Sequence, residues 1–453
     1  MRYLTLSGKI TIFKSLAISK IVYITYMSYV PSDVISHLEM VHKKIVWNGK
    51  RPKIKHTSLI GDFSKGGLKD VDITSKFTAL HLCWLKRLYD DNFHPWKLIP
   101  TFLFKKLFKC SSPMFYPNLD PNTSILDTLP IFYKNIVNKW VSFSKSEPIT
   151  ASSVLSESIW YNRHIKIDSR SIQPTFFNIK ENLFVHNLVN ENGEFLSWVS
   201  FREKYHLNQV MFFKWLQLKS SIPARWLKIV KESVGFNNLC HFSPHINYNA
   251  RILLLEKLSS RHIYNILIKT LFKTPTAQLL FDNKFDVPDW KKIYLLPRDV
   301  TVDAYTRIFQ YKILNNILFL NKKLFLFGIV DSPLCSLCNL ENETPIHLFS
   351  ECHVSKALWA DLTFFLQGHV HLEVLTPQNA LLGFTDDSAI HHIVNHILLI
   401  FKIFLYKYRS KNPTFMLLLS KIKNVIEVEK RLCFSDRRRI KFHSKWSKIL
   451  DII

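Results

Sequence analysis

A group of three cysteines and one histidine between residues 335 and 352 restricts the fold of this chain more than any other feature of its sequence. Cys335 and Cys338 are separated by two residues, so their thiolates can hold one side of a tetrahedral ion on a tight turn. His347 and Cys352, with four residues between them, can supply the other side from the start of a helix. Three soft sulfur ligands and one imidazole favour Zn²⁺ and leave no position for a catalytic water. The spacing predicts a structural zinc knuckle; the alternative is a chance pair of cysteines.

The charge balance indicates a polyanionic partner. The 453-residue chain has 61 Lys and Arg against 35 Asp and Glu, which gives a formal net charge of +26. Phosphate backbones attract such a chain without regard to sequence, so RNA and DNA are the expected partners. With 47% hydrophobic residues, the chain can fill a core and is not a disordered basic tail. Its ten glycines form neither G-x-G-x-x-G nor G-x-x-x-x-G-K, which argues against a nucleotide-binding fold.

The apolar stretches are too short or too interrupted to predict a membrane partner. The stretch Ile397–Tyr406 contains Lys402 and is shorter than the roughly 18 residues that a spanning helix requires. Lys9, Lys14 and Lys20 interrupt the apolar residues near the N-terminus, so no secretion signal is expected. Seven cysteines, an odd number, fit a reducing intracellular compartment better than a disulfide framework.

Hydrophobic periodicity predicts a mainly α, multi-part protein. In the first hundred residues, one helix begins near a capping Ser7 and ends at Pro31, a second runs from Ser32 to Asn48-Gly49, and a third begins at about Asp72. Between the second and third helices, Pro52 keeps the basic run 50–56 in an extended loop. Prolines between 100 and 148 indicate a boundary, and residues 159–172 suggest a small hairpin.

The last 150 residues return to a helical pattern. An amphipathic helix is predicted over 303–314, a short one up to Phe327, and a single basic helix from about Ile422 to Trp446. We therefore divide the chain into a helical region (1–100), a mixed α/β connector (101–300), the zinc module with its bracing helices (301–370) and a basic helical region (371–453). No internal repeat at a period of 20–50 residues is evident.

Two basic runs are the best candidates for phosphate contacts, although solvated faces are the commoner role of such runs. These residues are Lys50, Arg51, Lys53, Lys55, Arg437, Arg438, Arg439 and Lys441. His391, His392 and His396 have no Cys or carboxylate beside them in the sequence, so a polar stripe is favoured over a second metal site. Trp47, Trp84 and Trp359 occur at helical core spacing, which favours packing over base stacking.

The zinc cluster and its surroundings resemble a known family. The cluster, the stretch Phe309–Asn316, His347-Leu348-Phe349 and Trp359 resemble the zinc-binding segment at the C-terminus of LINE-type (non-LTR) retrotransposon reverse transcriptases. Leu6–Ile10, Ile45–Lys50 and Gly66-Gly67-Leu68 resemble the thumb that follows the polymerase palm in those proteins. The resemblance implies a thumb-like region over 1–100 and a C-terminal part that grips template RNA and target DNA in a nuclear or cytoplasmic ribonucleoprotein. The polymerase portion of the parent polyprotein is a further implied partner.

Catalytic residues of a polymerase are not recognisable in the sequence. A palm needs two metal-binding aspartates, one of them in a hairpin Y/F-x-D-D, because two metal ions act on the attacking oxygen and the triphosphate. Tyr89-Asp90-Asp91 lacks the spacing, and Phe384-Thr385-Asp386-Asp387 precedes Ser388 and two histidines rather than a buried strand. We interpret both as solvated turn carboxylates. The sequence thus predicts a nucleic-acid-binding fragment without palm, endonuclease or activity of its own. The alternatives are a zinc-stabilised structural or protein-interaction module from a decayed or host-adopted element, and a truncated frame of an active enzyme.

Overall fold

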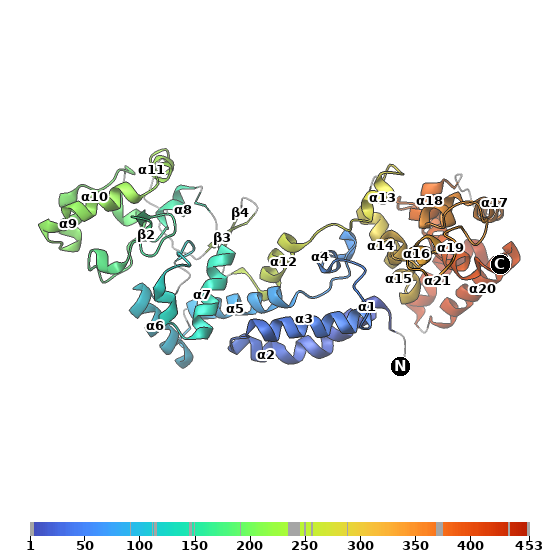
Figure 1. The fold of residues 1–453 in the computed structure, drawn as a ribbon, viewed down its shortest axis with the longest axis horizontal. Coiled ribbons are helices and arrows are strands. Elements are labelled where there is room, and N and C mark those ends of the chain that lie inside the picture. The colour runs from blue at the N-terminus through green and yellow to red at the C-terminus, as the bar shows by residue number, and fades with distance from the viewer. Residues whose placement is uncertain are drawn as a thin grey trace. The chain divides into compact units, whose positions relative to one another are not determined.

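A computed structural model describes residues 4–90, 92–110, 112, 116–144, 147–148, 150–190, 192–233, 245–248, 251–254, 257–287, 289–367, 375–433 and 435–450. These residues are mainly α-helical, as the sequence predicts (Figure 1). Their strands form two antiparallel hairpins, β1 (Lys166–Ile167) with β2 (Arg170–Ser171) and β3 (His245–Tyr248) with β4 (Arg251–Leu254). The first hairpin lies inside the predicted segment 159–172.

The chain divides into two compact units that interleave along the sequence. Unit 1 contains Met1–Ala17, Met40–Val71 and Lys269–Ile453, and unit 2 contains Ile18–Glu39 and Asp72–Ile268. The predicted region 1–100 therefore contributes to both units. Helix α3 (Ser32–Trp47) belongs to unit 2 up to Glu39 and to unit 1 from Met40 onward.

Unit 2 is a helical assembly around a core rich in tryptophan. Helix α5 (Ile73–Tyr89) contacts α2 (Ser19–Met27) on one side and α7 (Ile131–Ser144) on another. Trp140, Trp160 and Trp226 are completely buried in this core, and Trp84 of α5 is buried as predicted. The remaining helices of the unit are α6 (Leu98–Phe108), α8 (Ala151–Leu155), α9 (Trp198–Tyr205), α10 (Phe212–Ser221), α11 (Ala224–Lys231) and most of α12 (Ser260–Leu271).

The N-terminal part of unit 1 is held by a small apolar cluster and a close backbone approach. Ile10 of α1 (Leu6–Ile12), Val46 of α3, and Leu59 of α4 (His56–Leu59) are buried together with Ile308 from the C-terminal part of the unit. A Cβ atom at Gly67 would lie 2.1 Å from the carbonyl oxygen of Gly61, so only glycine fits there. The run 50–56, predicted as an extended loop, is an irregular loop over residues 50–55 with bends at Lys50, Lys53 and Ile54, and His56 already begins α4.

The C-terminal part of unit 1 packs around α19 (Ala389–Tyr408), whose side chains from Ile393 to Leu405 are all buried. Helices α14 (Trp290–Val300), α15 (Ala304–Leu314) and α20 (Phe415–Arg431) contact it, and Figure 1 shows them grouped there. The other helices of this part are α13 (Gln278–Asp282), α16 (Asn321–Leu326), α17 (His353–Gln367), α18 (Pro377–Leu382) and α21 (Asp436–Leu450).

Helix boundaries agree with the sequence at two predicted helix starts and differ in two places. The predicted helix starts at Asp72 and Asp303 are confirmed, and the structure shows that these two residues cap α5 and α15. The cap of α1 is Thr5 rather than Ser7, because the Thr5 hydroxyl accepts a hydrogen bond from Gly8 N–H and Ser7 lies inside the first turn. The predicted single basic helix over 422–446 is two helices, α20 and α21. The turn between them lets Trp446 become fully buried and donate from its Nε1 to Glu429 Oε2 at 2.8 Å.

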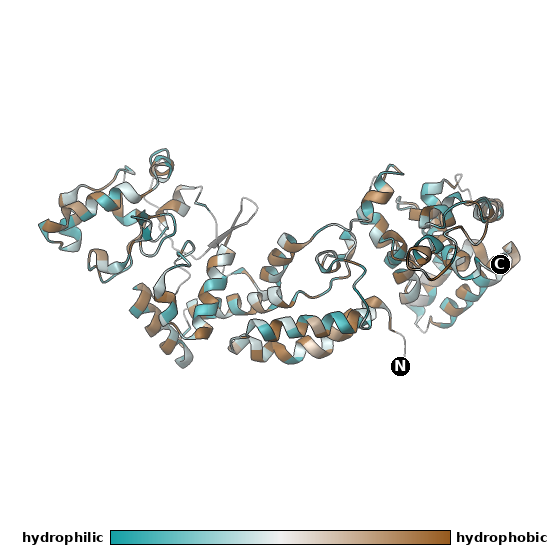
Figure 2. Ribbon diagram, in the orientation of Figure 1, coloured by the Kyte–Doolittle hydropathy of each residue, from teal (hydrophilic) through white to brown (hydrophobic). Residues whose placement is uncertain are grey.

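Within the described residues, two helices are long and apolar enough, by length and composition, to cross a membrane. The first runs over Leu6–Met27, where a π-helical turn (Phe13–Ile18) joins α1 to α2, and 22% of its most apolar 18-residue window is buried. The second is α19, in which 72% of the corresponding window is buried. A mostly buried core helix of a water-soluble protein meets the same criteria of length and composition as α19. Figure 2 shows hydrophilic and hydrophobic residues alternating along α1 to α3. The expectation that the chain has no membrane partner therefore stays a prediction.

Candidate zinc centre and basic surface

The structure brings the four predicted zinc ligands together in unit 1. The sulfur atoms of Cys335, Cys338 and Cys352 and one ring nitrogen of His347 all lie within 4.8 Å of one another. Cys338 Sγ is 3.2 Å from His347 Nε2. Two ligands of a tetrahedral zinc ion lie about 3.6 Å apart when one is sulfur and the other nitrogen. The four donor atoms of the Cys₃His set are thus close enough together to hold one metal ion.

Backbone hydrogen bonds close the knuckle, and the thiols of Cys335 and Cys352 contact each other. Cys335 N–H donates to Glu341 O at 2.7 Å, and Asn339 N–H donates to Cys335 O at 2.9 Å, which closes the knuckle. The contact with the thiol of Cys335 lowers the pKa of Cys352 to about 4, and the same contact together with burial raises the pKa of Cys335. A metal ion replaces the shared proton, since thiolates are the form that binds zinc.

The second half of the cluster is built on a wide helical turn. His347–Glu351 form a π-helical turn, and Cys352 stands at its C-terminal end, directly before α17. The sequence predicted an ordinary helix start here. Two carbonyls of the turn are satisfied by side chains of α17: Ser355 Oγ donates to Leu348 O at 2.7 Å, and Trp359 Nε1 donates to Phe349 O at 2.9 Å. Trp359 is therefore a packing residue that also holds the turn carrying two ligands.

Two glutamates support the cluster, and sequence reasoning missed both. Glu341 Oε2 accepts a hydrogen bond from His347 Nδ1 at 3.0 Å, which leaves Nε2 toward the sulfurs in the manner of outer-shell carboxylates around zinc. Glu343 is completely buried and accepts hydrogen bonds from the backbone N–H groups of Asn321 (3.1 Å) and Ser336 (2.9 Å). It also forms an ion pair with Arg409 at 3.3 Å. In the sequence, the only sign of such a role was that both glutamates lie between the two cysteines of the knuckle and the second pair of ligands. Their spacing alone does not reveal these contacts.

Comparison with known families identifies this region. Residues 259–359 match the family described as zinc-binding in reverse transcriptase. This region is a reverse-transcriptase zinc-binding segment. The match begins just before α12, includes all four residues of the Cys₃His cluster and ends at Trp359. Zinc is accordingly the metal that the donor set takes, as predicted from the residue types. A search of curated proteins gave no match.

The two predicted phosphate-binding runs lie in different settings. Lys50, Arg51, Lys53 and Lys55 are exposed on the loop before α4. Arg439 of α21 is also exposed, and pairs with Asp436 at 3.7 Å. Arg437, Arg438 and Lys441 fall in the same helix, but their side chains lie outside the described residues.

The loop run belongs to a larger group of lysines, which we call the lysine cluster: Lys9, Lys50, Lys53, Lys312 and Lys323. Lys53 Nζ lies 3.5 Å above the ring of Phe319. Burial, and next the charges of Lys312 and Lys50, lower the pKa of Lys53. Burial and the charge of Lys53 lower the pKa of Lys323 to about 8. The fold brings these ammonium groups close enough to repel one another, which sequence spacing does not reveal.

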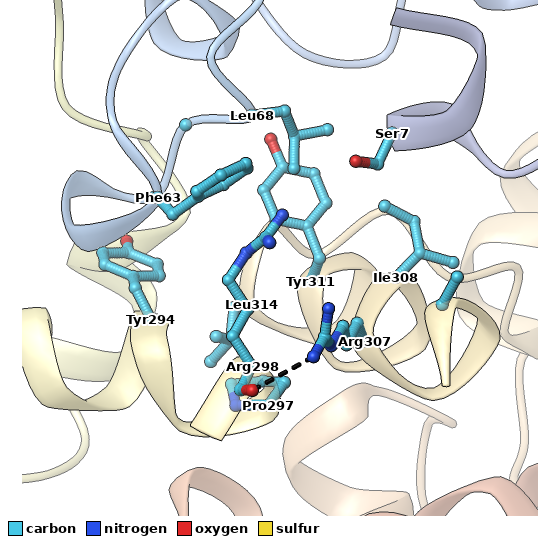
Figure 3. A pocket seen from close by; sticks show the side chains of 13 residues that line it. Ser7, Phe63, Leu68, Tyr294, Pro297, Arg298, Arg307, Ile308, Tyr311 and Leu314 are labelled. Atoms are coloured by element: carbon cyan, nitrogen blue, oxygen red, sulfur yellow. Dashed lines mark hydrogen bonds between the residues drawn. The ribbon is translucent and has the colours of Figure 1, made fainter. Parts of the chain in front are cut away.

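A cavity of about 120 Å³ contains two arginines that the sequence analysis did not select (Figure 3). Arg298 extends toward Phe63, with its guanidinium carbon 3.2 Å from the ring centroid. Arg307 donates to Thr301 O at 2.6 Å and to Arg298 O at 3.1 Å. Both guanidinium groups thus have partners within unit 1, and they hold α14, α15 and the turn at Phe63 in place.

The acidic and histidine motifs have separate local partners. Asp386, in the segment between α18 and α19, pairs with His391 of α19 at 2.6 Å. Its neighbour Asp387 lies 3.5 Å from Lys292. His392 contacts Asp299 O, and His396 Nδ1 lies 2.7 Å from Lys445 Nζ. The three histidines therefore face three different groups. Asp90 follows the end of α5, and Asp91 lies outside the described residues.

Proposed function

We propose that this chain binds RNA and DNA through their phosphate backbones and is the C-terminal part of a LINE-type non-LTR reverse transcriptase. The family match to a reverse-transcriptase zinc-binding segment supports the relationship to that enzyme class. The thumb-like sequence stretches at 6–10, 45–50 and 66–68 all lie in the N-terminal part of unit 1. The chain would act intracellularly, in the nucleus or cytoplasm, beside the polymerase portion of its parent protein.

The lysine cluster is the observation that carries the proposal. Lys9 lies on α1, Lys50 and Lys53 on the loop before α4, Lys312 on α15 and Lys323 on α16. Lys312 and Lys323 fall inside the zinc-binding segment. Burial lowers the pKa of Lys9, Lys53, Lys312 and Lys323, and the charge of a neighbouring lysine lowers it further at Lys9, Lys53 and Lys323. A phosphate bound among them relieves this repulsion, so the cluster favours an anionic ligand.

Zinc has a structural role in this proposal. When bound, it cross-links the knuckle to the turn before α17 and fixes that part of the segment. The chain's own residues then bind and position nucleic acid, and no catalytic step is assigned to them. Arg437, Arg438, Arg439 and Lys441 of α21 would add phosphate contacts from the basic C-terminal region.

Salt-dependent binding tests the proposal. Fluorescence anisotropy of labelled single-stranded RNA and duplex DNA with the full zinc-loaded chain should show log affinity falling linearly with log salt concentration. Replacing Lys50 and Lys53 by glutamine should reduce the slope for duplex DNA by about 2, because each lost phosphate contact contributes about 0.9. A matched control, Lys105→Gln with Lys106→Gln, removes the same charge from exposed positions of α6 and should leave the slope unchanged.

Two results would contradict the proposal. Affinity that does not respond to salt would rule out phosphate recognition as its basis. Equal losses in the Lys50/Lys53 variant and in the Lys105/Lys106 control would show that net charge alone, rather than the lysine cluster, attracts nucleic acid.

A protein-interaction role is the second candidate, favoured by apolar side chains on the surface of the zinc-binding segment. Leu326, Ile329 and Leu340 are 65–73% exposed around the knuckle. Soluble proteins seldom leave several large apolar residues exposed near one another unless a partner covers them. A zinc-dependent module that fails to bind RNA or DNA at low salt would favour this candidate over the first.

A further inference from the structure

Three side chains in the N-terminal part of unit 1 form a second set of metal-binding donors. His42 lies on α3, His56 begins α4, and Asp70 lies in the extended segment before α5. Their ligand atoms lie within 4.8 Å of one another. His42 Nε2 is 2.9 Å from Asp70 Oδ1, and His56 Nδ1 is 3.6 Å from Asp70 Oδ2. No sequence motif links these three residues, and 13 residues separate each one from the next.

The carboxylate of Asp70 has one oxygen without a hydrogen bond. The Asp70 side chain is 1% exposed, and Oδ1 accepts hydrogen bonds from His42 Nε2 and from Val71 N–H at 2.8 Å. Oδ2 has no hydrogen-bond partner among the described residues. Leaving a buried carboxylate oxygen unsatisfied costs free energy, so a ligand that satisfies it is favoured.

The site has three protein donors and opens on a cavity, whereas the Cys₃His cluster has four protein donors. A cavity of about 270 Å³ is lined by His42, His56 and Asp70, and also by Lys43, Lys53 and Lys55. We propose that His42, His56 and Asp70 bind a second divalent transition-metal ion, with a solvent-facing position left open toward this cavity.

The donor set fits Zn²⁺ or a similar ion. Two imidazole nitrogens and one carboxylate oxygen are a common ligand set for zinc sites with an open position. Ligand atoms at about 2.0–2.2 Å from zinc lie about 3.4 Å apart. The 3.6 Å between His56 and Asp70 already matches this separation. The 2.9 Å between His42 and Asp70 would widen by about half an ångström if an ion replaced the proton between them. The nearby lysines weaken cation binding, so this site should release its ion before the Cys₃His cluster does.

Zinc stoichiometry tests the proposal on the full chain. After equilibration with Zn²⁺ and removal of the excess, elemental analysis should give two zinc ions per wild-type chain and one in His56→Ala or Asp70→Asn. His56→Ala is the safer variant for folding, because His56 is 35% exposed and its removal leaves the His42–Asp70 pair intact. Asp386→Asn is the matched control, since it alters another His–Asp pair and should retain two zinc ions.

A chelator titration supplies a second readout. Wild-type protein should release zinc in two steps, and His56→Ala should lack the step at lower chelator concentration. One zinc ion per wild-type chain overturns the proposal, as do two retained ions in both His56→Ala and Asp70→Asn. In those cases, the three residues are a hydrogen-bonded brace between α3, α4 and the segment before α5.

Discussion

Replacing Lys402 by methionine should stabilise unit 1 by about 3 kcal/mol at pH 7. Lys402 lies in the middle of α19 and is 1% exposed. Its Nζ donates one hydrogen bond, to Leu381 O at 2.8 Å, and burial lowers its pKa from 10.5 to about 7. Each pKa unit corresponds to about 1.4 kcal/mol, and at pH 7 the folded group is half protonated, so the cost of burying this amine is about 4 kcal/mol.

The methionine variant removes this cost without opening a cavity. Methionine is similar in length and flexible, so it fills the same space. The carbonyl of Leu381 keeps a second donor, Gln310 Nε2 at 3.1 Å, so the lost hydrogen bond leaves it satisfied. Losing the Lys402 bond offsets about 1 kcal/mol of the gain.

The pH dependence has a definite sign. Because the folded-state pKa is lowered, the unfolded chain binds more protons between pH 7 and pH 10.5, and wild-type stability rises with pH across that window. After about 1 kcal/mol is subtracted for the lost hydrogen bond, the advantage of the variant should shrink from about 3 kcal/mol at pH 7 to about 1 kcal/mol at pH 9. Urea denaturation followed by circular dichroism at both pH values measures it. Lys407→Met, on the exposed side of the same helix, is the control and should change stability by less than about 0.5 kcal/mol. A destabilised Lys402→Met, or an advantage that does not change with pH, would refute the reasoning.

Three other predictions concern the zinc site and unit 2. Cys352→Ser or a strong chelator should unfold the knuckle, seen as loss of amide-exchange protection over 335–359, because structural zinc and folding are coupled; protection that persists without zinc would contradict this. Glu341→Gln should weaken zinc affinity about 10–100-fold in a competition assay, with the exposed Glu194→Gln of unit 2 as the control, since Glu341 accepts from His347 Nδ1. Burial raises the pKa of Glu157 in unit 2 to about 7, although hydrogen bonds from Asn118 and Asn162 act in the opposite direction. Because the folded chain then holds a proton that the unfolded chain loses, the free energy of unfolding should fall by about 3 kcal/mol as pH rises from 4.5 to above 7. Glu157→Gln should abolish that slope in denaturation experiments and the exposed Glu194→Gln should not; a slope that survives in Glu157→Gln would rule out this carboxyl as its source.

Local features were predictable from the sequence, whereas contacts between distant segments were not. The span of α3, the start of α5 at Asp72 and the four zinc ligands follow from caps, periodicity and short-range spacing. The break between α20 and α21 does not, because burial of Trp446 against Glu429 decides it and helix propensity continues through the turn. The lysine cluster joins residues 9, 50–53 and 312–323, which no local pattern relates.

Helix α19, which carries the buried Lys402, and the cysteines of the zinc cluster belong to the same hydrophobic core of unit 1, so a change at one can affect the other. Leu381, the acceptor of the Lys402 ammonium group, is in α18, which packs against the turn that carries His347. Because Gln310 also holds the Leu381 carbonyl, we expect Lys402→Met to leave that turn in place and zinc affinity unchanged. The stabilisation by Lys402→Met should then be the same, within about 0.5 kcal/mol, in wild-type and Cys352→Ser backgrounds that retain the α19 core. A larger coupling energy in this double-mutant cycle, or a zinc affinity altered in Lys402→Met alone, would mean that the ammonium group itself helps to set the turn that holds His347.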